Sequence, residues 1–307
     1  MFGTSIALLG FGFALVLPQL SVTENSSGDS LAAAVYKTSF LLYEPVVVEV
    51  TLHLEKRFRP NEKDANEADK QLRRLRRRLD VELRDQHNET VRKGLLCGAQ
   101  FLPTESPAHD FRAAGLAFPQ SPDREGGFLH SELTGTFILV VRDRGTGLES
   151  NALPIEIAAP TEDARPPSEL FKESFPGALM MILERKGDKE TLGVFEHLAR
   201  DYSDTVYGKY ASVSLALLRW KDTFRQHNKT GGSEVWGPVT RELEKASTVF
   251  EGAHPLRERV LFDLARAQIL AGQSSEARRT VEILSRDFPN TEFGRKAKDI
   301  PTELTDQ

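Results

Sequence analysis

The residues that most often carry catalysis are present in this 307-residue chain, but their spacing does not form a known kind of active site. None of the seven histidines has a second histidine at the spacing of a zinc-binding pair, and Glu196-His197 is no exception. Asp201 and Asp204 suit a turn and a helix cap better than acid–base catalysis. The only cysteine, Cys97, has no evident base and cannot form an intramolecular disulfide. We therefore expect a protein that is not an enzyme, with no catalytic residue, no metal site and no cofactor.

Aromatic and arginine side chains at helical spacing are better candidates, because they point to binding. One stripe contains Tyr210, Leu217 and Trp220, and the corresponding stripe of a later segment contains Phe262 and Arg266. A helix that is apolar on two sides is either buried on both or exposed in a groove. We predict that these five residues line a groove that binds a partner. The alternative is that Trp220 and Phe262 are plain core residues.

A second candidate is the basic cluster in "NEKDANEADKQLRRLRRRLD". Leucines at helical spacing, Leu72, Leu75 and Leu79, predict a charged helix here, with acidic residues first and basic residues last. The basic residues form a possible anionic-surface patch: Arg73, Arg74, Arg76, Arg77 and Arg78. Such a patch would contact phospholipid or acidic glycan. The alternative is a solvated helix with no ligand.

The elements before and after this cluster have the alternation of β-strands. "YEPVVVEVTL" predicts one strand, and two hairpins are predicted with turns at His87-Asn88 and at Arg144 to Gly147. Residues 33–160 resemble the immunoglobulin-like domains of secreted bacterial proteins. This resemblance implies an all-β sandwich that serves as a spacer or a binding module.

The second half of the chain contains one pattern twice. "FEHLARDYSDTVYGKYA" (Phe195–Ala211) returns as "VEILSRDFPNTEFGRKA" (Val281–Ala297). In each copy one helix closes, and Thr205 or Thr291 then caps the next helix, while a glycine three residues later lets the helices approach. A repeated helix–turn–helix joint predicts a stacked helical array.

Glu258 to Thr291 makes one unit of the length of a tetratricopeptide repeat, with Gly272 in its turn and Ala277 at a helix crossing. The joint is similar to repeats in bacterial envelope proteins, such as the Tol-Pal-associated periplasmic coordinators and the outer-membrane assembly lipoproteins. This resemblance implies an adaptor that binds other proteins.

The predicted class is a multidomain chain: an all-β immunoglobulin-like sandwich followed by an all-α tetratricopeptide-like helical solenoid. The predicted segments are a signal and polar link (1–29), the β-sandwich (33–160) with a helical insertion at about 61–79, a Pro-rich linker (161–170) and the helical repeats (171–302). The apolar run Ile6–Leu20 is too short to span a bilayer and has no preceding Lys or Arg. It still predicts export to the periplasm or cell envelope, with an uncleaved anchor or a misplaced start as alternatives.

The predicted function is that of an exported, non-enzymatic adaptor or scaffold that binds a protein or peptide of the cell envelope. The alternative is a glycan- or anionic-lipid-binding module that uses the β domain and its basic helix, with weak contact to a membrane surface. The net charge of −5 gives no reason to expect nucleic acid as a partner. The sequence leaves the oligomeric state open.

Overall fold

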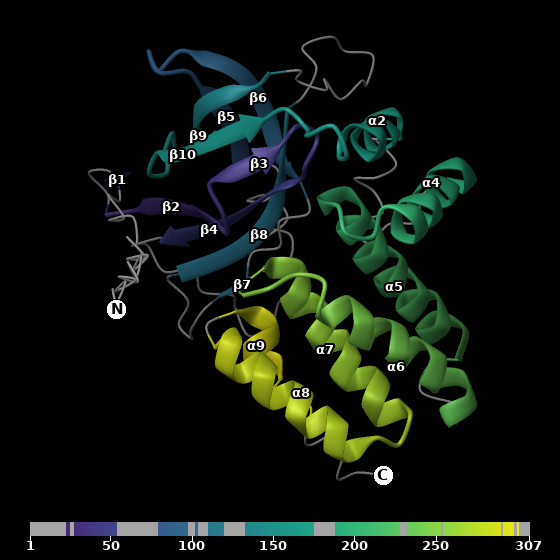
Figure 1. The fold of residues 1–307 in the computed structure, drawn as a ribbon. Coiled ribbons are helices and arrows are strands. Elements are labelled where there is room, and N and C mark those ends of the chain that lie inside the picture. Colours follow the sequence, from purple (N-terminus) through teal and green to yellow (C-terminus); the bar gives the residue numbers. More distant parts are fainter. Residues whose placement is uncertain are drawn as a thin grey trace, which may run out of the picture.

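The computed structural model describes a β half followed by a helical half (Figure 1). The described residues are 23–24, 28–53, 79–97, 102–103, 110–119, 133–174, 188–227, 232–252, 254–289, 291–297 and 300. The predicted signal, Ile6–Leu20, lies outside these ranges. Within them, no helix combines the length and the apolar character needed to cross a membrane.

The strands join into one hydrogen-bonded sheet. They are β1 (Thr23–Glu24), β2 (Ser30–Val35), β3 (Ser39–Leu41), β4 (Val46–His53), β5 (Leu79–Arg84), β6 (Thr90–Cys97), β7 (Leu102–Pro103), β8 (Asp110–Pro119), β9 (Gly135–Asp143) and β10 (Leu153–Ala158). Their order is β1-β2-β4-β8-β6-β5-β9-β10-β3, and β7 pairs with β8. The sheet is mixed because β10 and β3 run parallel, whereas the other described pairs are antiparallel.

This sheet curls around a single core. Leu31 of β2, Val141 of β9 and Ile155 of β10 belong to the same buried cluster, although β2 lies near one end of the strand order and β10 near the other. The strong twist of β-sheets allows such curling. Both predicted hairpins are confirmed: β5 pairs with β6 across a turn in which Asn88 has φ of 64°, and β9 pairs with β10.

The helices follow in order along the chain. They are α2 (Arg165–Glu173), α4 (Lys189–Asp201), α5 (Val206–His227), α6 (Ser233–Ser247), α7 (Pro255–Leu270), α8 (Ser274–Asp287) and α9 (Glu292–Lys296). From α4 onward each helix packs against the next, and α7 also contacts both α5 and α9. Helix α2 begins inside the predicted Pro-rich linker, because proline fits the first turn of a helix, where its missing N–H is not needed.

The repeated sequence forms the same joint twice, as predicted. Thr205 Oγ1 accepts a hydrogen bond from the Gly208 N–H at 3.2 Å, and Thr291 Oγ1 accepts one from Gly294 at 3.2 Å. Each threonine hydroxyl also donates to the carbonyl of the residue that closes the preceding helix. The same hydrogen bonds therefore connect α4 to α5 and α8 to α9.

The predicted fold class is wrong. An immunoglobulin-like sandwich has two facing sheets, whereas the described strands form one continuous mixed sheet. The helices are not an independent solenoid either, because Tyr43 and Val47 from the β half lie in the main helical core. The strand β4 explains this: Val48 and Val50 face the core of the sheet, while Val47 faces the helices. Alternation indicated strands correctly but could not say which strands pair.

Two smaller predictions also fail. Leu79, assigned to the charged helix, is the first residue of β5 and is buried in the sheet core. The Gly-rich sequence "HNKTGGSEVWGPV" (His227–Val239) predicts a break before the next helix, yet its second part, Ser233 to Val239, forms the start of α6 with Pro238 inside the helix. Trp236 holds the first turns of α6 in place, because its side chain is completely buried against the other helices.

Candidate functional site

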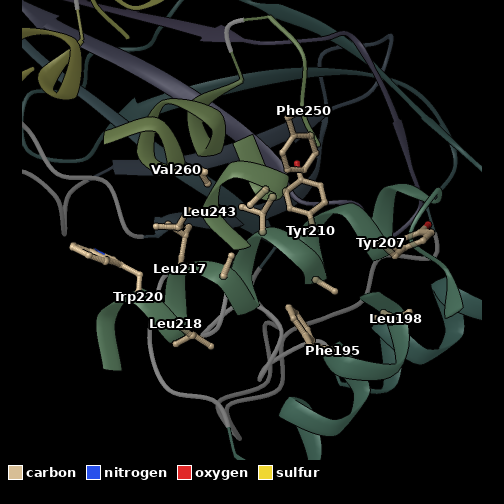
Figure 2. Packing of buried hydrophobic residues seen from close by; sticks show 14 of the residues in the cluster. Phe195, Leu198, Tyr207, Tyr210, Leu217, Leu218, Trp220, Leu243, Phe250 and Val260 are labelled. Carbon is tan, nitrogen blue, oxygen red and sulfur yellow. The ribbon is translucent and has the colours of Figure 1, made fainter. Parts of the chain in front are cut away.

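Tyr210 of the predicted groove lies at the centre of the contact between sheet and helices. Its side chain is buried, and its ring packs beside Phe250 (Figure 2). The Tyr210 hydroxyl is 3.2 Å from the Pro45 carbonyl, to which it donates, and 3.2 Å from the Tyr36 hydroxyl. It is also 3.3 Å from His254 Nε2. Tyr210 therefore connects α5 to the loop between β2 and β4 and to the residue before α7.

The protonation of this cluster follows from its hydrogen bonds. His254 Nδ1 accepts from the Leu256 N–H at 3.1 Å, so a neutral His254 carries its proton on Nε2 and can donate it to Tyr210. Burial, assisted by the charge of Lys37, lowers the pKa of His254 to about 3. Burial and the Glu44 carboxylate raise the pKa of Tyr36, whose hydroxyl donates to Glu44 at 3.0 Å.

Leu217 and Trp220 are likewise interior residues (Figure 2). Only 1% of Leu217 and 4% of Trp220 is exposed. A partner could not contact Tyr210 or Leu217 without opening the core. The predicted groove must therefore be redrawn without them, because a helix packed on both sides has no free apolar face.

Arg266 and Phe262, in contrast, come together at an accessible position. From Glu258 to the end of α7, every residue is buried except Arg259, Phe262, Arg266 and Leu270. The Arg266 guanidinium carbon lies 5.6 Å from the ring centre of Trp220, 5.0 Å from that of Phe224 and 5.8 Å from that of Phe262. Such cation–π contacts hold a guanidinium in place.

The same pattern continues toward α9. The rings of Phe262 and Phe293 are 4.9 Å apart, and Arg259 lies 4.9 Å from the Phe293 ring. We call the five partly exposed side chains the arginine–aromatic stripe: Phe224 of α5, Arg259, Phe262 and Arg266 of α7, and Phe293 of α9. Helix α7 contacts both α5 and α9, so the stripe forms a connected surface across the three helices.

A buried carboxylate lies beneath the stripe. The side chain of Asp263 is fully buried, and its Oδ2 accepts from Arg259 Nε at 2.7 Å. Burial raises the pKa of Asp263, while the charges of Arg259 and Arg266 oppose the rise. Asp263 Oδ1 makes no well-formed hydrogen bond in the described part of the chain: Arg266 Nη1 is 4.0 Å away, and the neighbouring Trp220 N–H only helps to lower the Asp263 pKa.

Sequence reasoning missed two members of the stripe, Phe224 and Phe293, and the buried Asp263 beneath it. Phe224 is one helical turn beyond Trp220, and Asp263 is one turn beyond Arg259, so helical spacing contained a signal for both. Phe293 belongs to the second copy of the repeated joint, and only the fold brings it beside Phe262. The basic cluster at residues 73–78 lies outside the described residues.

The described ranges contain no group of three or more His, Cys, Asp or Glu side chains that could hold a metal ion. In comparisons with known proteins, no family model matches the chain and no curated protein matches it. Within its described residues, the chain is a curled mixed sheet joined to packed helices that carry the arginine–aromatic stripe.

Proposed function

We propose that this protein is a non-enzymatic adaptor that binds a segment of another protein across the arginine–aromatic stripe. The observation that carries the proposal is the composition of the accessible positions of α7. From Glu258 onward, α7 leaves only Arg259, Phe262, Arg266 and Leu270 partly exposed, and three of these four residues are arginine or aromatic. Arginine and aromatic residues are enriched where protein partners bind, and they often dominate the binding free energy.

The rigidity of the stripe supports the same function. Arg266 is held among three rings, and Arg259 is fixed between Asp263 and Phe293. Side chains that are already ordered lose little conformational entropy when a partner arrives. The repeated joint, which resembles joints of tetratricopeptide proteins of the bacterial envelope, also supports an adaptor. The apolar run Ile6–Leu20 supports export, with the periplasm or cell envelope as the proposed location.

The test places a photo-reactive residue at Phe224 in the tagged full-length chain and activates it in the native cells. A matched variant has the same residue at Leu192 of α4, an exposed leucine away from the stripe. Adducts identified by mass spectrometry should form from position 224 and not from position 192. The captured protein is then purified and titrated against the wild type, Phe262→Ala and Leu192→Ala.

We expect Phe262→Ala to weaken binding by about tenfold or more, because an aromatic side chain at the centre of an interface contributes about 1–2 kcal/mol or more. Leu192→Ala should bind like the wild type. Equal adducts from both positions, or equal affinity of all three chains with unchanged circular dichroism, would contradict the proposal.

A further inference from the structure

Arg266 has more hydrogen-bonding capacity than the described part of the chain uses. A guanidinium carries five N–H donors in a planar fork and has no acceptor. The nearest described carboxylate oxygen, Asp263 Oδ1, is 4.0 Å from Nη1, which is too long for a hydrogen bond. The Arg266 side chain is 29% exposed, so an incoming group can reach it.

The surrounding rings determine how the fork can be used. The Trp220, Phe224 and Phe262 rings lie within 5.8 Å of the guanidinium carbon. An arginine can stack on aromatic rings and at the same time offer its N–H edge to a planar acceptor. A carboxylate is the planar acceptor that matches two parallel N–H groups.

The charges of the stripe lead to the same ligand. Asp263 is paired with Arg259 through a 2.7 Å hydrogen bond, so the positive charge of Arg259 is compensated at close range. Asp263 also lies within ion-pair distance of Arg266, at 4.0 Å, but one carboxylate cannot balance two guanidinium groups, so the stripe keeps a net positive charge. An anionic group is therefore complementary to this position, and the adjacent Phe262 and Phe293 rings are complementary to an apolar neighbour.

We infer that the bound segment is acidic, and that Arg266 binds the carboxylate of a Glu or Asp side chain next to an aliphatic or aromatic residue. This inference rests on the proposed function, since it names the chemistry of the segment bound at the same stripe. A peptide fits better than a phosphate group, because one fork suits one carboxylate, whereas the apolar rings would contact nothing on inorganic phosphate.

The test measures fluorescence anisotropy of the full-length chain with two labelled peptides. One is a twelve-residue peptide of alternating Glu and Phe, and the other has Gln in place of each Glu. The acidic peptide should bind at least tenfold more tightly. Arg266→Met, which keeps an apolar stem but removes the fork, should remove this preference. Arg286→Met, at an exposed arginine of α8, should keep it.

Arg266→Lys separates the contribution of the paired hydrogen bonds from that of the positive charge. A lysine keeps one positive charge but cannot make the paired hydrogen bonds, so we expect about a tenfold loss relative to the wild type. Thermal unfolding of both variants shows whether they fold. If acidic and amide peptides bind equally, or if Arg266→Met and Arg286→Met bind alike, the carboxylate inference is overturned. Competition by inorganic phosphate or by phosphatidylserine vesicles at the peptide's own potency would also overturn it.

The affinity of the two variants for the cross-linked partner distinguishes the carboxylate inference from the proposed function. If Phe262→Ala weakens that partner and Arg266→Met does not, the stripe is the binding surface and the carboxylate inference fails alone. If Phe262→Ala has no effect on the partner, the proposed function itself fails.

Discussion

The carbonyl oxygen of Tyr202 occupies the space that a side chain on Gly208 would need. A Cβ added to Gly208 would lie 2.0 Å from that oxygen. The second copy of the joint has the same geometry, because a Cβ on Gly294 would lie 1.8 Å from the Phe288 oxygen. Neither glycine has a positive φ, so each is required by close approach and not by backbone conformation.

Gly208→Ala should therefore destabilise the protein strongly. The clash involves backbone on both sides, so the two helices must move apart, and we expect a loss of about 3 kcal/mol or more in the free energy of unfolding. Urea denaturation followed by circular dichroism measures the change.

Gly193→Ala provides the matched control. Gly193 is an exposed residue in the middle of α4, and an added Cβ would meet nothing within 4 Å. Alanine should stabilise the helix here by about 0.5–1 kcal/mol, because glycine loses more backbone entropy. If both variants were equally stable, the proposed packing of the joint would be incorrect.

Tyr210→Phe should destabilise the contact between sheet and helices without changing its shape. The hydrogen bond that the hydroxyl donates to Pro45 and the one that it accepts from His254 are lost, and so is its contact with Tyr36, so these buried polar groups lose a partner. We expect a cost of about 1–3 kcal/mol. Tyr202→Phe should change stability by less than about 0.5 kcal/mol, since this tyrosine is partly exposed and lies outside the buried cluster around Tyr210. Similar losses in the two variants would contradict a special role for Tyr210.

The local elements could be predicted from the sequence, because they depend on neighbouring residues. The hairpin at His87-Asn88 and the threonine-capped joints follow from turn and capping preferences that act over a few residues. The assembly could not be predicted, because the pairing of β10 with β3 depends on contacts more than one hundred residues apart. A strand with one buried face looks the same in a sandwich and in a curled sheet.

The candidate site was predicted in part for a similar reason. Arg266 and Phe262 were selected by helical spacing, and they do meet at an accessible position. Tyr210 and Leu217 have the same spacing, but the loop before β4 and the neighbouring helices cover them. Spacing shows which side chains share a face of a helix, whereas burial depends on what the rest of the chain places against that face.

Stability should fall in acid because of His254. Its pKa is about 3 in the folded protein and 6.5 as the ordinary value, so the unfolded chain binds more protons between these pH values. The free energy of unfolding therefore rises with pH across this window and falls on acidification below pH 6.5. At pH 5 the contribution amounts to about 2 kcal/mol of lost stability. Among the described residues, Lys37, Tyr36 and Tyr210 act on or contact the His254 ring, and Glu44 is hydrogen-bonded to Tyr36 behind it.

His254→Asn tests this assignment, because asparagine can still cap α7 but does not titrate. Urea denaturation at pH 7.5, 6 and 5 should show a smaller fall for the variant than for the wild type. Parallel pH dependence in the two chains would show that other groups cause the acid sensitivity.

The last prediction concerns the helices without the sheet. Removing residues 1–160 takes away Tyr43 and Val47 from the helical core, and it takes away the Leu42 carbonyl that accepts from the Tyr207 hydroxyl at 2.5 Å. The fragment 161–307 should unfold at least about 10 °C below the full chain, because losing a packed face costs several kcal/mol. It should also bind a hydrophobic dye, since the uncovered face is apolar.

Tyr207→Phe shows whether the lost hydrogen bond to Leu42 contributes to the lower stability of the fragment. In the full chain this change removes the bond to Leu42 and should lower stability by about 1 kcal/mol. In the fragment that acceptor no longer exists, so the same change should have a smaller effect. A fragment as stable as the full chain, with an equal effect of Tyr207→Phe in both, would mean that the helices fold independently of the sheet.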